Sequence, residues 1–432
     1  MSDIYITGHR NPDLDSVCSA AAYAVLKNRI DPENRYIPVR PGHLSESAKR
    51  ILASLEITPP PYKRDIFPKV RDVMLSYDEE IDIDESLSVL AHAYSENNPS
   101  ATPVFDDGEF AGLVSVDDIA AWMLNHLSEE GNVVSVPSIR ETMRDQAEVF
   151  DADDLFEDAK SVFYSSSKRG IAVFDDGRYT GYVTRRCFLN TPSYKVILVD
   201  HNEAGQSIRG IETATVMEIV DHHRLDAVRT DLPIFIDAEP LGSTCTIVYQ
   251  LFLRNGVVPD PETAKLLLTG IIADTLILKS PTTTAVDVNA AEALSSICGV
   301  VTEEFGLAMF SNTEGLKTRD PETAITSDFK MYSEKGVKVG IGQCEVTTLD
   351  DLSEYRDAYL DALETVRKKN GLDWAVLMIT NVLNEHSVLL CTDFKANRRL
   401  SYKHIEGLVY DMPGVLSRKK QLLPEVLFAI GS

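Results

Sequence analysis

An internal repeat constrains the fold of this chain more than any other feature of its 432 residues. Three short segments recur in one register, each shifted by 69 residues: VRDVM at 70–74 as IRETM at 139–143, VFDDG at 104–108 as VFDDG at 173–177, and GLVS at 112–115 as GYVT at 181–184. Several matches at one offset indicate a duplicated unit rather than chance similarity. The middle of the chain is therefore predicted to hold two copies of one small domain.

Each copy predicts the same order of elements. A short helical start and an amphipathic helix precede a strand that ends in Asp-Gly, a second strand follows, and a further helix closes the copy. Asp-Gly between two apolar runs is a strong signal for a tight β-hairpin. We assign the first copy to residues 66–127 and the second copy to residues 134–190, with only a short segment between them.

The segments on either side of the pair read as one α/β domain that the pair interrupts. Strands are expected at residues 3–8, 194–200 and 216–220, and helices at residues 15–28, 244–254 and 261–273. This alternation predicts a mostly parallel, doubly wound sheet built from residues 1–65 and 191–312. A C-terminal α/β domain is assigned to residues 318–432, with strands at 337–346 and 374–383 and a helix at 352–369.

Acidic and imidazole side chains gather where strands of the interrupted domain are predicted to end. The candidate metal ligands are His9, Asp13, Asp15, Asp200, His222 and Asp274, with His223 beside them. Singly, Asp13 and Asp15 can be helix caps, and a lone buried Asp or His can be a satisfied core group. Together they are too many for structural polar groups, and two metal ions with a bridging carboxylate explain the surplus. Mixed imidazole and carboxylate ligation favours Mn, Co, Fe or Zn.

The charge balance argues against a general nucleic-acid or membrane-surface binder. The chain has 42 Lys and Arg against 67 Asp and Glu, a formal charge of −25, whereas such binders need basic faces. Because basic residues are scarce, the run SRKKQ with Arg418 and Lys419 stands out as a candidate phosphate clamp. Further candidates in the C-terminal domain are Lys330 and Lys317. The alternative for such a run is a solvated basic turn at the surface.

Cysteine usage and hydropathy indicate the compartment. The six cysteines are scattered singly without a CxxC pair, which fits reduced structural residues rather than a zinc ribbon or a disulfide framework. No stretch approaches 18 uninterrupted apolar residues, and the N-terminus has no leader pattern, so a cytoplasmic protein without a membrane span is expected. A small anionic ligand remains the class of partner that a local group of cations can bind.

In the motifs GHRNPDLDS, VDHNE, VDHHR, IIADT and SRKKQ, in this order and spacing, the sequence resembles the family II inorganic pyrophosphatases of the DHH phosphoesterase superfamily. The resemblance spans essentially the whole chain. It implies an enzyme that hydrolyses pyrophosphate to two orthophosphates, with two Mn or Co ions in the DHH domain and Mg entering with the substrate. It also implies a DHHA2-type C-terminal domain that closes over the site, and a homodimer.

The same resemblance implies a role for each candidate residue. The ligands of one ion are His9 and Asp13, those of the other ion are Asp15, His222 and Asp274, and Asp200 lies between the two ions. The residues that contact the substrate are His223, Lys330, Arg418 and Lys419.

The repeat pair resembles a pair of cystathionine-beta-synthase (CBS) domains, which often bind adenine nucleotides. Their usual motif has Gly, two apolar residues, Ser or Thr, two further residues and Asp. The first copy fits it as GLVSVDD at 112–118, whereas the second copy has Cys187 in place of the Asp. The resemblance implies regulation by AMP, ADP, ATP or diadenosine polyphosphates. The candidate nucleotide-binding residues are Ser115, Asp118, Lys168, Arg169, Thr184 and Arg186.

Three other functions stay open at this stage. A DHH-type phosphodiesterase is disfavoured because those relatives carry a Gly-Gly-His type motif, and this chain has no Gly-Gly pair. An exopolyphosphatase would be distinguished by its preference for chain length. A non-catalytic nucleotide-sensing regulator would carry a vestigial metal site, and the full set of candidate ligands argues against it.

Overall fold

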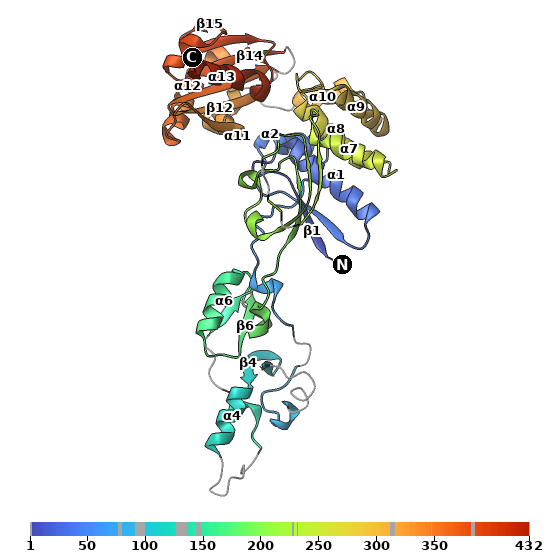
Figure 1. Cartoon of the computed structure of the whole chain (residues 1–432), viewed down its shortest axis with the longest axis vertical. Coiled ribbons are helices and arrows are strands. Elements are labelled where there is room, and N and C mark those ends of the chain that lie inside the picture. Colours follow the sequence, from blue (N-terminus) through green and yellow to red (C-terminus); the bar gives the residue numbers. More distant parts are fainter. Residues whose placement is uncertain are drawn as a thin grey trace. The chain divides into compact units, whose positions relative to one another are not determined.

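The computed structural model describes residues 2–76, 80–90, 100–126, 136–143, 148–226, 229–230, 232–311, 316–346, 348–381 and 385–431. The chain divides into two compact units, Met1–Asp65 with Lys195–Ser432, and Ile66–Tyr194. The first unit is thus made of two segments that the second unit separates in the sequence (Figure 1). We call residues 2–65 with 195–311 the split domain, residues 316–431 the C-terminal domain, and Ile66–Tyr194 the inserted unit.

A five-stranded parallel sheet forms the centre of the split domain. Its order is β10-β9-β8-β1-β2, with β1 Asp3–Thr7, β2 Arg35–Val39, β8 Lys195–Val199, β9 Thr215–Asp221 and β10 Phe235–Ala238. The apolar run of β8 is buried along almost its whole length, as expected for a central strand covered on both faces. The expectation of an α/β fold with a parallel sheet is confirmed.

Helices supply the rest of the core of the split domain. They are α1 Leu14–Ile30, α2 Glu46–Ser54, α7 Thr244–Arg254, α8 Pro261–Asp274, α9 Ala285–Cys298 and α10 Thr302–Ser311. Both α7 and α8 begin within one residue of the predicted positions because Ser243 and Asp260 cap them, and Pro261 is favourable in a first turn. Small residues of α1 let α8 pack closely against it.

The C-terminal domain contains a mixed six-stranded sheet in the order β11-β12-β13-β14-β16-β15. The strands are β11 Phe329–Glu334, β12 Val337–Val346, β13 Trp374–Asn381, β14 His386–Cys391, β15 Lys403–Glu406 and β16 Val409–Pro413. The helices are α11 Pro321–Ser327, α12 Leu352–Lys369 and α13 Leu423–Gly431, with a π-helical turn at Arg418–Leu422. Every residue of β13 is buried, so this strand lies at the centre of the domain.

The inserted unit contains two small sheets, one from each copy of the repeat. The first pairs β3 Ala101–Asp106 with β4 Glu109–Ser115, and the second contains β5 Val149–Asp151, β6 Gly170–Asp175 and β7 Arg178–Thr184. Both predicted hairpins are confirmed, since Asp107, Gly108, Asp176 and Gly177 all have positive φ, as a two-residue turn of this type requires.

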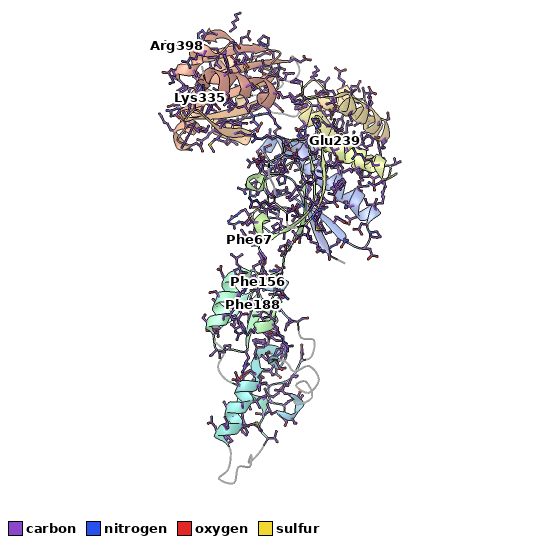
Figure 2. The ribbon with its side chains drawn as sticks, viewed as in Figure 1. Phe67, Phe156, Phe188, Glu239, Lys335 and Arg398 are labelled. Atoms are coloured by element: carbon purple, nitrogen blue, oxygen red, sulfur yellow. The ribbon has the colours of Figure 1, made fainter. Side chains whose placement is uncertain are left out.

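Helices of the inserted unit are α4 Val116–Asn125, α5 Ile139–Thr142 and α6 Phe156–Ser165. The amphipathic helix predicted in the first copy falls largely outside the described residues, whereas α6 is its counterpart in the second copy. In the core of that copy Phe156 packs against Phe188, with 5.4 Å between the centroids of their rings. Figure 2 labels both residues. The helix expected at the end of the second copy is only a 3-10 turn at Arg185–Phe188, since Pro192 follows closely and disfavours helix before it.

The remaining short 3-10 turns are Val70–Asp72, Ala204–Gln206, Ile211–Thr213, Leu316–Thr318 and Lys395–Arg399. Within the described residues no single helix has the length and apolar character needed to cross a bilayer. The pair Ala285–Cys298 and Thr302–Phe310, bent by 89°, passes the same test of length and composition when taken together.

Candidate metal centre

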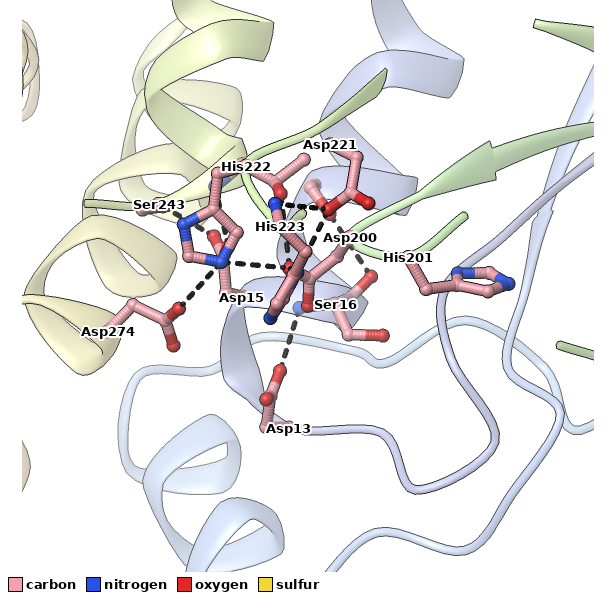
Figure 3. A network of polar contacts seen from close by, with 12 residues as sticks. Asp13, Asp15, Ser16, Asp200, His201, Asp221, His222, His223, Ser243 and Asp274 are labelled. Atoms are coloured by element: carbon pink, nitrogen blue, oxygen red, sulfur yellow. Dashed lines mark hydrogen bonds and ion pairs between the residues drawn. The ribbon is translucent and has the colours of Figure 1, made fainter. Parts of the chain in front are cut away.

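The predicted metal ligands meet at one edge of the parallel sheet of the split domain (Figure 3). The segment from the end of β1 to the start of α1 contains His9, Asp13 and Asp15. The carboxyl ends of β8 and β9 carry Asp200 and His222, and Asp274 is the last residue of α8. The carboxyl ends of parallel strands are where open α/β sheets place their ligand sites. The structure brings all six of these side chains, and His223, into one cluster.

Three overlapping groups in this cluster each have ligand atoms within 4.8 Å of one another. The groups are His9 with Asp13 and Asp200, Asp15 with His222 and Asp274, and Asp200 with His222 and His223. Asp200 belongs to two of them, and its position between two metal ions stays a prediction.

Asp200 lies at the centre of the cluster and is 1% exposed. Its Oδ2 is 3.3 Å from His9 Nε2, and its Oδ1 is 3.5 Å from His222 Nε2. The backbone of Asp200 has a φ of 60°, in the left-handed region, which aspartate visits more readily than most residues with a side chain. A conformation of this kind, held by the surrounding structure, is common at functional sites.

Asp13 serves as a helix cap and as part of the cluster at the same time. Its Oδ1 accepts a hydrogen bond of 2.9 Å from Ser16 N at the start of α1, while its Oδ2 is 3.3 Å from His9 Nε2. The side chain is 53% exposed, so it forms the rim of the cluster. The capping alternative considered for Asp13 is therefore compatible with a ligand role, because each role uses a different oxygen.

His222 presents a buried nitrogen that lacks a partner. Its Nδ1 lies 3.1 Å from the carbonyl oxygen of Leu241, an arrangement that fixes the ring and leaves Nε2 as the inward nitrogen. This Nε2 is 3.5 Å from an oxygen of Asp200 and from an oxygen of Asp274, and it has no hydrogen-bond partner within the part of the chain that the structure describes. A buried imidazole nitrogen aimed at two carboxylates fits a transition-metal ion, and the donor set of the cluster fits it too.

His223 is oriented by two residues that the sequence analysis did not single out. Its Nδ1 lies 2.9 Å from Asp221 Oδ1, and its backbone N donates to the same oxygen at 3.0 Å. The other oxygen of Asp221 accepts a 2.5 Å hydrogen bond from Asn202. The ring of His223 is therefore held with Nε2 as the nitrogen that can meet a ligand.

The electrostatics of the cluster favour a bound cation. Burial, together with the charge of Asp200, raises the pKa of Asp15 to about 7. Burial and the neighbouring carboxylates raise the pKa of Asp274 well above its usual value. Burial alone would lower the pKa of His9, but Asp13 and Asp200 raise it well above the ordinary value. A bound divalent ion would stabilise the ionised form of both carboxylates and so oppose the effects of burial and of the neighbouring negative charges.

The predicted cations of the C-terminal domain lie in two of its elements. The π-helical turn before α13 contains Arg418 and Lys419, and the first strand, β11, contains Lys330. Arg418 is 8% exposed, and its guanidinium pairs with the carboxylate of Asp328 at 2.7 Å. Burial and the charge of Lys330 lower the pKa of Lys419, and the carboxylates of Asp200 and Asp274 oppose that shift. Lys419 therefore lies within electrostatic range of both Lys330 and the acidic cluster.

Comparison with known proteins now assigns the family. The family model described as "DHH family, N-terminal domain" matches residues 3–271. The chain belongs to the DHH family. A second model, the DHHA2 domain, matches residues 307–429 of this DHH-family protein. The match to residues 3–271 extends across the inserted unit, so it includes the first segment of the split domain from residue 3 and the second segment as far as residue 271.

Curated relatives resemble this DHH-family protein over nearly its whole length. A cobalt-dependent inorganic pyrophosphatase of Clostridium perfringens is 30% identical, with 98% of this chain and 97% of the relative covered. A probable manganese-dependent inorganic pyrophosphatase of Thermotoga maritima is 26% identical over the same shares. The crystal structure of a putative family II inorganic pyrophosphatase of Methanococcus jannaschii shares the fold, with a TM-score of 0.60, 23% identity and full coverage of both chains. The prediction that the chain is a hydrolase of the inorganic pyrophosphatase class is confirmed.

A cavity of about 550 Å³ in the inserted unit contains part of the predicted nucleotide site. Its lining residues include Lys168, Arg169 and Arg186, which belong to the predicted set, and also Arg185 and Asp117. The guanidinium of Arg169 pairs with the carboxylate of Asp117 at 2.7 Å, so the pair links the two copies of the repeat.

The other predicted nucleotide-binding residues make contacts within their own copy of the repeat. Asp118 is buried and accepts hydrogen bonds from the backbone N and the hydroxyl of Ser115, at 2.9 Å and 2.5 Å, which caps α4. The backbone N of Thr184 is 3.3 Å from Cys187 Sγ in the matching position of the second copy. Ser115, Asp118 and Thr184 are not among the lining residues of the cavity, and their nucleotide role stays a prediction.

Sequence reasoning missed the residues that orient the ligands of this DHH-family protein. Asp221 appeared there only inside the motif VDHHR, Thr244 appeared only as the first residue of an expected helix, and Ser243 did not appear. The signal that could have found Ser243 and Thr244 is the hydroxyl pair of the run GSTCT, because a helix that begins at the ligand edge aims its first donors at the site.

Proposed function

We propose that the protein hydrolyses inorganic pyrophosphate to two orthophosphates with two Mn or Co ions. The observation that carries this proposal is the cluster itself, in which His222 Nε2 is buried between Asp200 and Asp274 without a hydrogen-bond partner in the described residues. The pyrophosphatase relatives, named cobalt- or manganese-dependent, support the same substrate and the same metals.

Six residues would hold the ions, on the assignment that the family resemblance implies. One ion would be bound by His9 and Asp13, the other by Asp15, His222 and Asp274, and Asp200 would be shared between them. When bound, divalent ions of this kind stabilise charge as Lewis acids and make a nucleophile available near neutral pH. Mg would enter with the substrate, because pyrophosphate is heavily charged.

The protein's own side chains bind and orient the anion. Lys330, Arg418 and Lys419 supply positive charge from the C-terminal domain, and charge-assisted hydrogen bonds to phosphate oxygens are among the strongest that proteins form. Because Asp328 binds the guanidinium of Arg418 through Nη1, the remaining donors of this side chain are presented in a fixed direction. His223, whose Nδ1 is held by Asp221, can donate or accept a proton at Nε2 next to the departing phosphate.

The inserted unit is proposed to be a CBS pair that regulates the enzyme by binding AMP, ADP, ATP or diadenosine polyphosphates. Support comes from the internal repeat and from a cavity lined by Lys168, Arg169, Arg185 and Arg186 in a chain with a formal charge of −25. Such a concentration of cations against the overall charge fits a phosphate-bearing ligand. A ligand there would act on activity through its different affinities for two states of the protein, a coupling of typically 1–3 kcal/mol. We further propose that the protein is a homodimer, testable by sedimentation.

The test is phosphate release from pyrophosphate by purified protein loaded with Mn or Co, with Mg present. The matched control is Asp13→Asn, because asparagine caps a helix as well as aspartate does but removes the anionic oxygen. We expect fast release by the wild type and a loss of at least 100-fold in the variant. AMP and ATP titrations in the same assay give the sign of regulation. A folded, metal-loaded wild type that releases no phosphate but binds nucleotide would refute the enzyme and favour a sensor.

A further inference from the structure

The first turn of α7 donates hydrogen bonds to two of the proposed ligand carboxylates. Ser243 Oγ and Cys245 N donate to Asp15 Oδ1 at 2.6 Å and 3.0 Å, and Thr244 N donates to Asp15 Oδ2 at 2.7 Å. The hydroxyl of Thr244 donates to Asp200 Oδ1 at 3.1 Å. The three donor residues are fully buried, as is Asp15, so water does not replace these bonds.

These donors determine which part of Asp15 remains for a cation. An ionised carboxylate offers two lone pairs on each oxygen. Oδ1 already accepts two hydrogen bonds and Oδ2 accepts one, which leaves a single lone-pair position, on Oδ2. The positive end of α7 also stabilises the charge of a carboxylate placed there. Asp15 is therefore held in one orientation before any ion binds.

We propose that Ser243 and Thr244 are positioning residues of the metal centre, which hold Asp15 and Asp200 in the orientation that binds the metal ions. The inference rests on the proposed metal-dependent function. We expect Thr244 to contribute more to this positioning than Ser243, because Thr244 contacts both carboxylates. Its backbone N donates to Asp15 and its hydroxyl donates to Asp200. Outer groups that orient metal ligands typically contribute 10- to 100-fold to metal affinity or activity.

The chain offers a matched control two residues away on the same helix. Thr246 is as buried as Thr244, and its hydroxyl likewise donates to an aspartate, Asp287 Oδ1, at 2.6 Å. Asp287 caps α9 and is not one of the proposed metal ligands. Valine has nearly the shape of threonine and removes only the hydroxyl. Thr244→Val and Thr246→Val therefore remove the same group from the same helix, and only the first change affects a ligand.

The experiment measures Mn binding to metal-stripped full-length protein by isothermal titration calorimetry. We expect Thr244→Val to weaken Mn binding 10- to 100-fold, Thr246→Val to change it by less than about threefold, and Thr244→Ser, which keeps the hydroxyl, to restore most of the loss. Thermal unfolding of the stripped variants reports any general loss of stability, which we expect to be at least as large for Thr246→Val. If Thr244→Val does not fold, Ser243→Ala is compared with Thr246→Val in its place, with the same expectation.

Two results would overturn the inference. One is wild-type Mn affinity in Thr244→Val, and the other is an equal loss in Thr244→Val and Thr246→Val. Both leave the proposed metal centre intact as long as the wild type itself binds two Mn ions. A stripped wild type that is folded and binds no Mn would instead refute the metal centre, and this inference with it.

Discussion

Replacing Asp15 by asparagine in the metal-free protein should change stability in a way that depends on pH. Burial and the charge of Asp200 raise the pKa of Asp15 to about 7, whereas an aspartate of the unfolded chain titrates near 3.9. The folded state then holds the proton more tightly, so the stability that Asp15 contributes is present at acid pH and is lost as the pH rises towards 7. Asparagine does not titrate, and the variant escapes this loss.

The size of this change in stability follows from the interval between the unfolded and folded pKa values of Asp15. Each pH unit between the two pKa values removes about 1.4 kcal/mol from the wild type relative to the variant. Because Asp15 is half ionised at its folded pKa of about 7, the slope falls off near the upper end of this range. From pH 5 to pH 7 the wild type should therefore lose about 2 kcal/mol of unfolding free energy relative to Asp15→Asn, and the difference should level off above pH 7. The amide of the variant faces Thr244 N, which also donates, but the cost of that contact does not vary with pH.

Urea unfolding followed by far-UV circular dichroism, on chelator-treated proteins from pH 5 to pH 8, measures this difference. Asp260→Asn is the control, because Asp260 caps α8 in the same domain and its pKa is lowered, chiefly by the hydrogen bond from Thr263 N. Asp260 is ionised in both states above pH 5, so the effect of its replacement should not change with pH. A wild-type minus Asp15→Asn difference that is flat over this range, or that runs in the opposite direction, would refute the reasoning.

Three further predictions address the substrate, the core and the regulatory cavity. Lys419→Ala should raise KM for pyrophosphate about tenfold or more, since a hydrogen bond to a charged group contributes about 1.5–3 kcal/mol, and an unchanged steady-state KM would contradict this. Gly270→Ala should lower the unfolding free energy in urea by about 1–3 kcal/mol and weaken Mn binding, because an added Cβ would clash with Cys245 Sγ and approach Asp15 Oδ1 to 2.8 Å. Arg186→Ala should weaken AMP binding about tenfold in calorimetry, whereas Arg140→Ala, a surface arginine paired with Asp84, should not.

The elements that local patterns specify strongly were predictable from the sequence. Helix α7 lies where predicted because Ser243 is a preferred N-cap and apolar residues recur at helical spacing after it. Strands β8 and β9 end in the polar residues that form the site, so their convergence followed from the geometry of parallel sheets alone. Short edge elements such as β15 were missed, because all four of its residues are exposed and give no hydrophobic alternation.

The contacts that orient the site were not predictable for a different reason. Ser243 and Asp15 are separated by 228 positions, and only the packing of α7 against α1 brings the hydroxyl to the carboxylate. The pairing of Arg169 with Asp117 depends in the same way on how two copies of a repeat face each other. Local propensity carries no information on such distances, which tertiary packing sets.

The interruption of the split domain has a consequence for the order in which the chain can mature on the ribosome. Strand β1 pairs with β8, and 185 positions separate Asp15 from Asp200. At about 5–20 residues per second, roughly 10–40 s pass between the synthesis of the first three ligands and that of the fourth. The inserted unit is continuous in sequence and is complete before β8 emerges. The sheet next to His9, Asp13 and Asp15 therefore stays incomplete until β8 and Asp200 have been synthesised. Metal binding at this site is thus expected late in the biogenesis of the protein.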